Sequence, residues 1–113
     1  MTNVVRNGNN GRMAAAPELD LEAITVLCRR RHVNRLAVFG SVVTGAFDPD
    51  TSDADFLVEF DPASTTLFDD YFGLKEDLEG LLGVPVDLVA PRALENPYFA
   101  KSVRAGLREL YAA

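Results

Sequence analysis

The stretch from Val38 to Val58, VFGSVVTGAFDPDTSDADFLV, constrains the chain more than any other. It reads as an apolar strand that stops at Gly40 and Ser41, then a loop, then a second strand that opens with Asp53 and Asp55. Side chains two positions apart in a strand share a face, so the two carboxylates lean into the same space. Like charges about 4 Å apart repel by about 4 kcal/mol at an effective dielectric of about 20, and a divalent cation would reverse that repulsion. The pattern therefore favours a hard cation such as Mg²⁺.

The residues before the loop suit a phosphate. Gly40 lets the backbone approach a ligand closely, and Ser41 supplies a hydroxyl and an amide that can donate to a phosphate oxygen. Each piece alone has a plainer interpretation, because Gly-Ser after a strand also fits a turn and Asp-x-Asp also fits a solvated face or a cap. Their occurrence in this order favours a functional site.

The remaining periodicity predicts a single mixed domain. The expected elements are a helix opening at Pro17 or Asp20, a strand over 35–39, a helical turn over 41–44, a strand over 54–60, a helix over 67–82, a strand over 85–89, and a last helix that starts at Asn96. This alternation predicts an α/β (α+β) fold with a small mixed sheet of about three strands flanked by helices.

Two helices have apolar stripes that we expect to be buried. The first stripe consists of Leu67, Phe68, Tyr71, Leu74, Leu78, Leu81 and Leu82. The second consists of Phe99, Val103, Leu107, Leu110 and Tyr111, opposite the basic residues Lys101, Arg104 and Arg108. Between the two helices, Asp87 interrupts an apolar run. A carboxylate is costly to bury there unless it is paired or bound to a metal, although an edge-strand or capping acid is the alternative.

The ordered motifs resemble those of a known family. Phe39-Gly40-Ser41, then Gly45, then Ser52-Asp53-Ala54-Asp55 before an apolar run, are similar to the signature of the DNA polymerase beta superfamily of nucleotidyltransferases. The small size and Val86-Asp87-Leu88-Val89 narrow the resemblance to minimal nucleotidyltransferase (MNT) domains, and it spans roughly residues 19–111.

This resemblance implies a nucleotidyltransferase fold and a set of roles. Gly40 and Ser41 would bind the triphosphate of ATP. Asp53, Asp55 and Asp87 would form the catalytic carboxylate triad and bind two Mg²⁺ ions. The implied setting is a HEPN–MNT toxin–antitoxin pair, in which the antitoxin enzyme transfers AMP from ATP to a tyrosine hydroxyl of its cognate HEPN toxin.

Two other functions stay open. A degenerate domain would neutralise its toxin by direct binding alone, and it would tolerate loss of Asp53 and Asp55. A small-molecule nucleotidyltransferase is less favoured, because 113 residues leave little chain for a second acceptor-binding domain. The intact triad favours the protein-modifying enzyme, since a pure binder has no physical need for three converging acids.

One departure from the family pattern concerns charge. Many MNT domains carry arginines shortly after Gly-Ser, where this chain has Val42, Val43 and Thr44. Loss of that charge would weaken nucleotide binding or change its preference unless other cations compensate. The candidates for that compensation are Arg35, Lys75, Arg92 and Lys101.

Composition limits the partners. With 17 acidic and 11 basic residues the formal charge is −6, which does not attract a long nucleic acid, whereas ATP would bring its own Mg²⁺. The basic residues of the last helix fit solvation, an acidic partner or self-association.

Localisation and domain limits follow from simple patterns. The single cysteine, Cys28, fits a reducing cytoplasm, and no apolar run is long enough to span a membrane. Residues 1–16 are rich in Asn and Gly, which predicts a disordered leader before a minimal nucleotidyltransferase domain over 17–113. Whether Met13 is an alternative start stays open.

Overall fold

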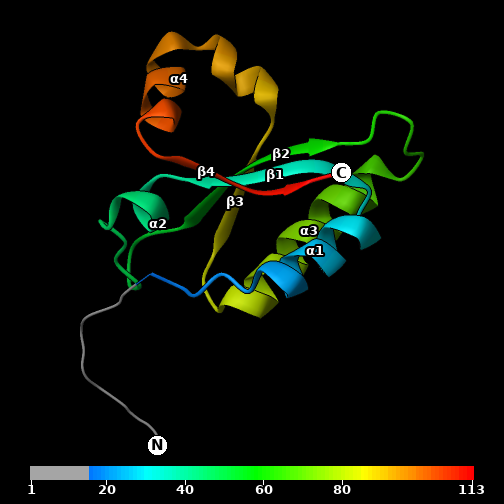
Figure 1. The fold of residues 1–113 in the computed structure, drawn as a ribbon, viewed down its shortest axis with the longest axis horizontal. Helices are drawn as coiled ribbons and strands as arrows, with labels where there is room; N and C mark the ends of the chain where they lie inside the picture. Colours follow the sequence, from blue (N-terminus) through cyan, green and yellow to red (C-terminus); the bar gives the residue numbers. More distant parts are fainter. Residues whose placement is uncertain (1–15) are drawn as a thin grey trace, which may run out of the picture.

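The computed structural model describes residues 16–113 and shows a four-stranded sheet with helices on both faces (Figure 1). The elements are α1 (Leu21–Arg30), β1 (Val33–Phe39), α2 (Ser41–Thr44), β2 (Ala54–Phe60), α3 (Leu67–Leu82), β3 (Val86–Val89), the 3₁₀ helix η1 (Pro91–Glu95), α4 (Pro97–Arg104) and β4 (Leu107–Ala112). Of the leader predicted over 1–16, residues 1–15 lie outside the described residues.

Local sequence signals explain where the helices begin and end. Asp20 caps α1, since its carboxylate accepts a hydrogen bond from the Ala23 amide at 3.1 Å. Asn96 caps α4 in the same way, with the Tyr98 amide at 2.9 Å, and proline follows at the first helical position. Gly83 ends α3 in the left-handed conformation, at φ +73°.

The strands lie in the order β3-β2-β1-β4. β1 is antiparallel to both β2 and β4, whereas β2 and β3 are parallel. In this register Asp55 lies opposite Phe39 on one side and opposite Asp87 on the other. Directly opposed residues of neighbouring strands share a face of the sheet, so these three side chains share one face.

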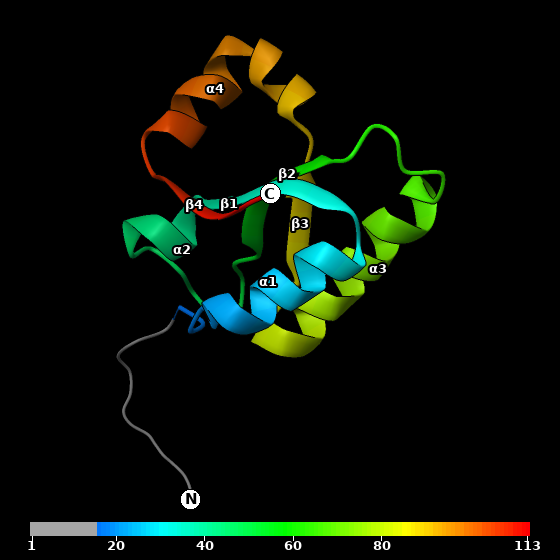
Figure 2. The same cartoon turned by 45° about the vertical axis from the view of Figure 1, so that its right-hand side comes forward.

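The two faces of the sheet differ in what covers them. α1 and α3 pack side by side on one face, and η1 and α4 arch over the other (Figures 1 and 2). The first face forms the main core, whose fully buried members include Ile24, Cys28, Leu36, Val38, Phe56, Leu74 and Leu78. On the second face, the rings of Phe39 and Phe99 meet edge to face with centroids 5.7 Å apart.

The fold class predicted from sequence is confirmed, but the strand count of three is wrong. The last apolar stripe does not stay helical: α4 ends at Arg104, and Leu107–Ala112 form β4 on the free edge of β1. Gly106 follows the last turn of α4, and the β1 edge offers backbone partners that a longer helix would leave unpaired. Leu107, expected in the core, is 47% exposed.

The predicted stripe of α3 is only partly buried. Leu74 and Leu78 are fully buried, as expected, but Phe68 is 75% exposed and Leu67 and Leu81 are also exposed. The neighbours of α3 are α1 and the edge strand β3, so only the part of the apolar stripe that faces them is buried. The prediction that Phe68 packs in the core is therefore wrong.

No helix among residues 16–113 is long and apolar enough to cross a membrane.

Candidate active site

The motif residues converge at one end of the sheet. Gly40 follows the last residue of β1, Asp55 is the second residue of β2, and Asp87 is the second residue of β3. Asp55 and Asp87 are direct partners in the parallel pair, so their side chains leave the sheet side by side. The structure thus brings together, on the α4 face, three positions that are 15 and 32 residues apart in sequence.

Gly40 and Asp55 fit against each other. Gly40 has φ +75°, and a Cβ built on it would lie 2.7 Å from Oδ2 of Asp55. That distance is shorter than van der Waals contact, and the backbone conformation disfavours any residue with a side chain. Glycine therefore keeps open the space beside this carboxylate.

The Gly-Ser turn and the loop before Asp53 are held by local hydrogen bonds. α2 begins at Ser41, and Gly45 closes it at φ +85°, which confirms the predicted helical turn. In the loop, Ser52 Oγ accepts from the Asp48 amide at 3.0 Å, while the Ser52 amide donates to Asp48 O at 2.7 Å. These hydrogen bonds fix the loop immediately before Asp53, which is exposed and precedes the first residue of β2.

Burial and the neighbouring acids both act on the carboxylate of Asp55. The pKa of Asp55 is raised above its ordinary value, chiefly because burial disfavours the charged form and further because of the charges of Asp87 and Asp53. Asp55 is half-buried, whereas Asp53 and Asp87 are exposed. The prediction that Asp87 is buried at a cost in free energy is therefore wrong. Its position opposite Asp55 is the stronger reason to consider it functional.

The donor set suits Mg²⁺. Among residues 16–113, no group of three or more His, Cys, Asp or Glu side chains is placed to hold a metal ion, so Asp53, Asp55 and Asp87 do not form a ready-made three-carboxylate site. Mg²⁺ does not require such a site, because it binds through one or two carboxylates and fills its other positions with water and substrate phosphates. The register of Asp55 with Asp87, and the space that Gly40 leaves beside Asp55, fit an ion held in this way.

The structure limits which cations replace the missing arginines. Arg35 lies 3.5 Å from Glu109 on β4, and Lys75 donates to Glu79 at 2.9 Å and to the backbone of Val86 at 2.7 Å. Lys75 is thus held by two partners on α3 and β3, whereas the contact of Arg35 with Glu109 joins two exposed side chains and is weak. Arg92 on η1 and Lys101 on α4 are exposed.

A cavity of about 250 Å³ lies farther along the same face of the sheet. Leu57 and Glu59, which follow Asp55 at alternate positions, line it together with Pro91 and Leu94 of η1. The carboxylates themselves do not line it, so it adjoins the site without containing it.

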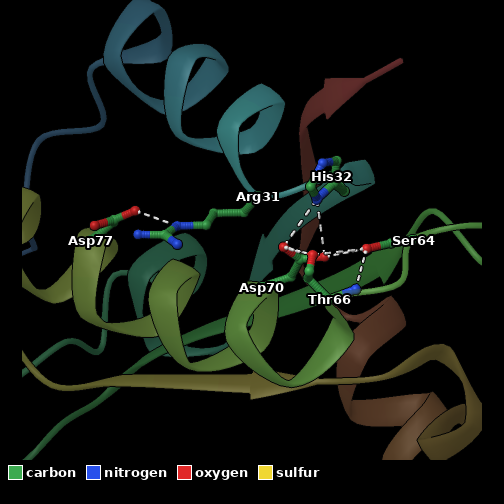
Figure 3. A network of polar contacts seen from close by, with 6 residues as sticks. All are labelled: Arg31, His32, Ser64, Thr66, Asp70 and Asp77. Atoms are coloured by element: carbon green, nitrogen blue, oxygen red, sulfur yellow. Dashed lines mark hydrogen bonds and ion pairs between the residues drawn. The ribbon is translucent and has the colours of Figure 1, made fainter.

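Two sets of polar contacts were not predicted, and the first lies at the end of the sheet opposite the site, where Val33 pairs with Phe60. The first connects the start of β1 with α3: the buried carboxylate of Asp70 accepts from Ser64 at 2.6 Å and from Thr66 at 3.2 Å, and it contacts His32 Nδ1 at 3.0 Å (Figure 3). The second connects α3 with β3 through Lys75 and Glu79. The only sequence signal for the second was the four-residue spacing of Lys75 and Glu79, which indicates a helical ion pair but not its backbone partner.

Known proteins are similar to this chain in sequence and in fold. Residues 22–109 match the family model described as "Nucleotidyltransferase domain". Protein adenylyltransferase MntA of Thermococcus cleftensis is 42% identical over 84 residues, which cover 74% of this chain and 78% of that protein. A solved structure of a candidate minimal nucleotidyltransferase is 41% identical with a TM-score of 0.59, covering 77% of this chain and 85% of that one.

A further solved structure, a toxin–antitoxin complex with AMP-PNP, is 25% identical with a TM-score of 0.62, covering 84% of this chain and 75% of that chain. The family match covers most of the chain and includes every residue of the site described above. The chain therefore belongs to the nucleotidyltransferase domain family, as a minimal member related to protein adenylyltransferases, and it is a nucleotidyltransferase.

Proposed function

We propose that this protein is the antitoxin of a toxin–antitoxin pair and that it transfers AMP from ATP to a tyrosine hydroxyl of its cognate HEPN toxin. The observation that carries the proposal is the register of Asp55 with Asp87, with Gly40 packed against the Asp55 carboxylate. The names of its relatives support the same reaction and setting, since one is a protein adenylyltransferase and another is a toxin–antitoxin complex with a nucleotide analogue.

Each motif residue has a role in this reaction. Gly40 and Ser41 bind the triphosphate where β1 gives way to α2. Asp53, Asp55 and Asp87 are the metal-binding acids, and Mg²⁺ held by them would neutralise phosphate charge and polarise the reacting oxygens. The acceptor oxygen forms a bond to the α-phosphorus in line with the bond that breaks, and pyrophosphate leaves. Asp87 takes the hydroxyl proton.

The test follows transfer of the nucleotide itself. Purified protein, ATP labelled in the α-phosphate and Mg²⁺ are added to a lysate of the host, and labelled proteins are separated by mass. We expect one labelled band with the wild type and none with Asp53→Asn, because the variant loses a carboxylate from the metal-binding set. The matched control is Asp50→Asn, an exposed acid of the same loop that lies outside the motif and should label normally.

The result also separates the enzyme from a pure binder. If the cognate toxin is present and bound by the wild type but carries no label, transfer is excluded and neutralisation by contact alone becomes the better account. If Asp53→Asn labels as well as the wild type, the assigned site is wrong even though the reaction occurs.

A further inference from the structure

The outer edge of β3 is bound by side chains instead of by another strand. Within the parallel pair, the Ala54 amide donates to Pro85 O at 2.9 Å, so Pro85 and Asp87 direct their backbone groups toward β2. Backbone groups alternate along a strand, so Val86 and Leu88 direct theirs outward. A short strand with unpaired outward groups is held by its one neighbour only, and its position is weakly fixed.

One row of residues on α3 occupies these outward groups. Glu79 Oε2 accepts from the Val86 amide at 3.0 Å, Lys75 Nζ donates to Val86 O at 2.7 Å, and Tyr71 Oη donates to Leu88 O at 3.4 Å. The three residues are spaced four apart, so they form a single line along the helix. Lys75 and Glu79 also bind each other at 2.9 Å, which fixes the row internally. Together we call Tyr71, Lys75 and Glu79 the α3 row.

The α3 row binds the backbone on both sides of the candidate catalytic acid. Asp87 lies between Val86 and Leu88, the two residues whose backbones the row binds. The pKa of Lys75 is raised, chiefly by its hydrogen bond to Glu79 and by the charge of Glu79, with Asp87 as the smallest contribution. The pKa of Glu79 is lowered, first by its bond from the Val86 amide and then by Lys75, so the acceptor is held in its charged form.

We propose that Glu79 and Lys75 are positioning residues of the transfer reaction: they lock β3 in register against β2 and thereby hold Asp87 opposite Asp55. This inference rests on the proposed function, because Asp87 is taken as a member of the reacting set. Misplacement of a catalytic group by about 1 Å can lower the rate by about a hundredfold, so a clamp on β3 has a direct kinetic consequence.

The first variant is Glu79→Ala, which removes both the acceptor of the Val86 amide and the partner of Lys75. We expect kcat for labelling of the lysate acceptor to fall by about tenfold or more, with less than about threefold change in KM for ATP. Hydrogen exchange at the Asp87 amide, which the substitution does not touch, should accelerate by about tenfold. Glu79→Gln keeps an acceptor oxygen and should restore most of kcat and most of the protection.

The matched control is Glu76→Ala, which removes the same charge from an exposed position on the same helix. It should change neither kcat nor exchange at Asp87. A thermal melt of each variant, measured separately, distinguishes a merely stabilising role. Such a role would lower Tm in Glu79→Ala while kcat of the folded protein and exchange at Asp87 stay at wild-type values. That result would overturn the proposal.

The two proposals fail in different ways. If the wild type transfers no label, the proposed function fails, and the exchange measurement alone then decides whether the α3 row holds β3. If the wild type is active and Glu79→Ala keeps its kcat, the positioning role fails and the function stands. If Glu79→Ala does not fold, Lys75→Met is the milder variant. It removes the bond to Val86 O and keeps the bond from the Val86 amide to Glu79, and it should reduce kcat and accelerate exchange at Asp87 by smaller factors. Unchanged values of both quantities would overturn the proposal.

Discussion

At the scale of single residues, the site depends on one atom that is absent. Gly40 has no Cβ, and the space where a Cβ would lie is beside Asp55 Oδ2. The backbone at this position has φ +75° and ψ −143°, a region that residues with side chains rarely adopt. Glycine is thus required twice, once for the conformation and once for the carboxylate.

We therefore expect Gly40→Ala to harm both stability and activity. Backbone strain should lower the free energy of unfolding by about 1 to 3 kcal/mol, and the displaced Asp55 carboxylate should remove most label transfer. Urea unfolding and the α-phosphate assay measure the two effects. Gly80→Ala is the control: a Cβ there meets nothing within 4 Å, and alanine in a helix should stabilise by up to about 1 kcal/mol. An active Gly40→Ala would contradict the assigned geometry.

At the scale of elements, the carboxylate of Asp70 connects three segments. His32 precedes β1, Ser64 belongs to the connection between β2 and α3, and Asp70 itself is in the first turn of α3 (Figure 3). Burial alone would raise the pKa of Asp70, but hydrogen bonds from Ser64, His32 and Thr66 outweigh it and leave the pKa below its ordinary value. A lowered pKa means that the ionised form stabilises the fold.

This shift predicts how stability depends on pH. The contribution of Asp70 is fully present above its unfolded pKa, near about 4, and it is lost as the pH falls through the lower folded-state pKa. Asp70→Asn should lower the free energy of unfolding at pH 7 by about 1 to 2 kcal/mol, and the deficit should shrink toward acid. Urea titrations at pH 7 and below pH 4 measure this. A constant deficit, or the same behaviour in Asp69→Asn at an exposed neighbour, would contradict it.

At the scale of the whole molecule, the main core and the candidate active site lie on opposite faces of the sheet. The face that packs against α1 and α3 contains fully buried apolar residues such as Leu36 and Phe56, while the opposite face holds Asp55 and Asp87. Burial is the main source of stability, and it is concentrated on one side. Substitutions on the two faces should therefore affect different properties.

Two phenylalanines make this separation measurable. Phe56→Ala empties a fully buried position and should lower the free energy of unfolding by about 3 to 5 kcal/mol. Phe68→Ala removes a ring that is 75% exposed and lies against the tilted ring of Phe72, with centroids 4.7 Å apart, so the loss should stay below about 1 kcal/mol. Equal losses in chemical denaturation would mean that Phe68 packs against the core after all.

Sequence reasoning found the elements whose signals are local. The caps of α1 and α4, the turn closed by Gly45 and the alternation in β2 each depend on neighbouring residues, and all of them are present in the structure. The helix predicted over the second apolar stripe is wrong at its end, because the spacing of Leu107, Leu110 and Tyr111 fits a strand as well as a helix face. The free edge of β1, which is distant in sequence, decided between the two.

The residues of the candidate site differ in the same way, because only some of them carry a local sequence signal. The two-residue spacing of Asp53 and Asp55 is enough to predict a shared site. No local pattern places Asp87 opposite Asp55, and the expectation that Asp87 belongs to the site came from the family resemblance. The role of Glu79 was hidden, since its partner Val86 lies beyond the end of the helix and offers only a backbone amide. Contacts to backbone leave no complementary residue in the sequence.

The α3 row has a consequence for assembly. An uncovered edge strand is a template on which a second molecule can add its own strand, and repeated addition leads to aggregates. In this protein, Lys75 and Glu79 occupy the outward groups of Val86, so that template is blocked at its first residue. The side chains that align an acid for chemistry thereby also stop the sheet from growing from one molecule into the next along β3.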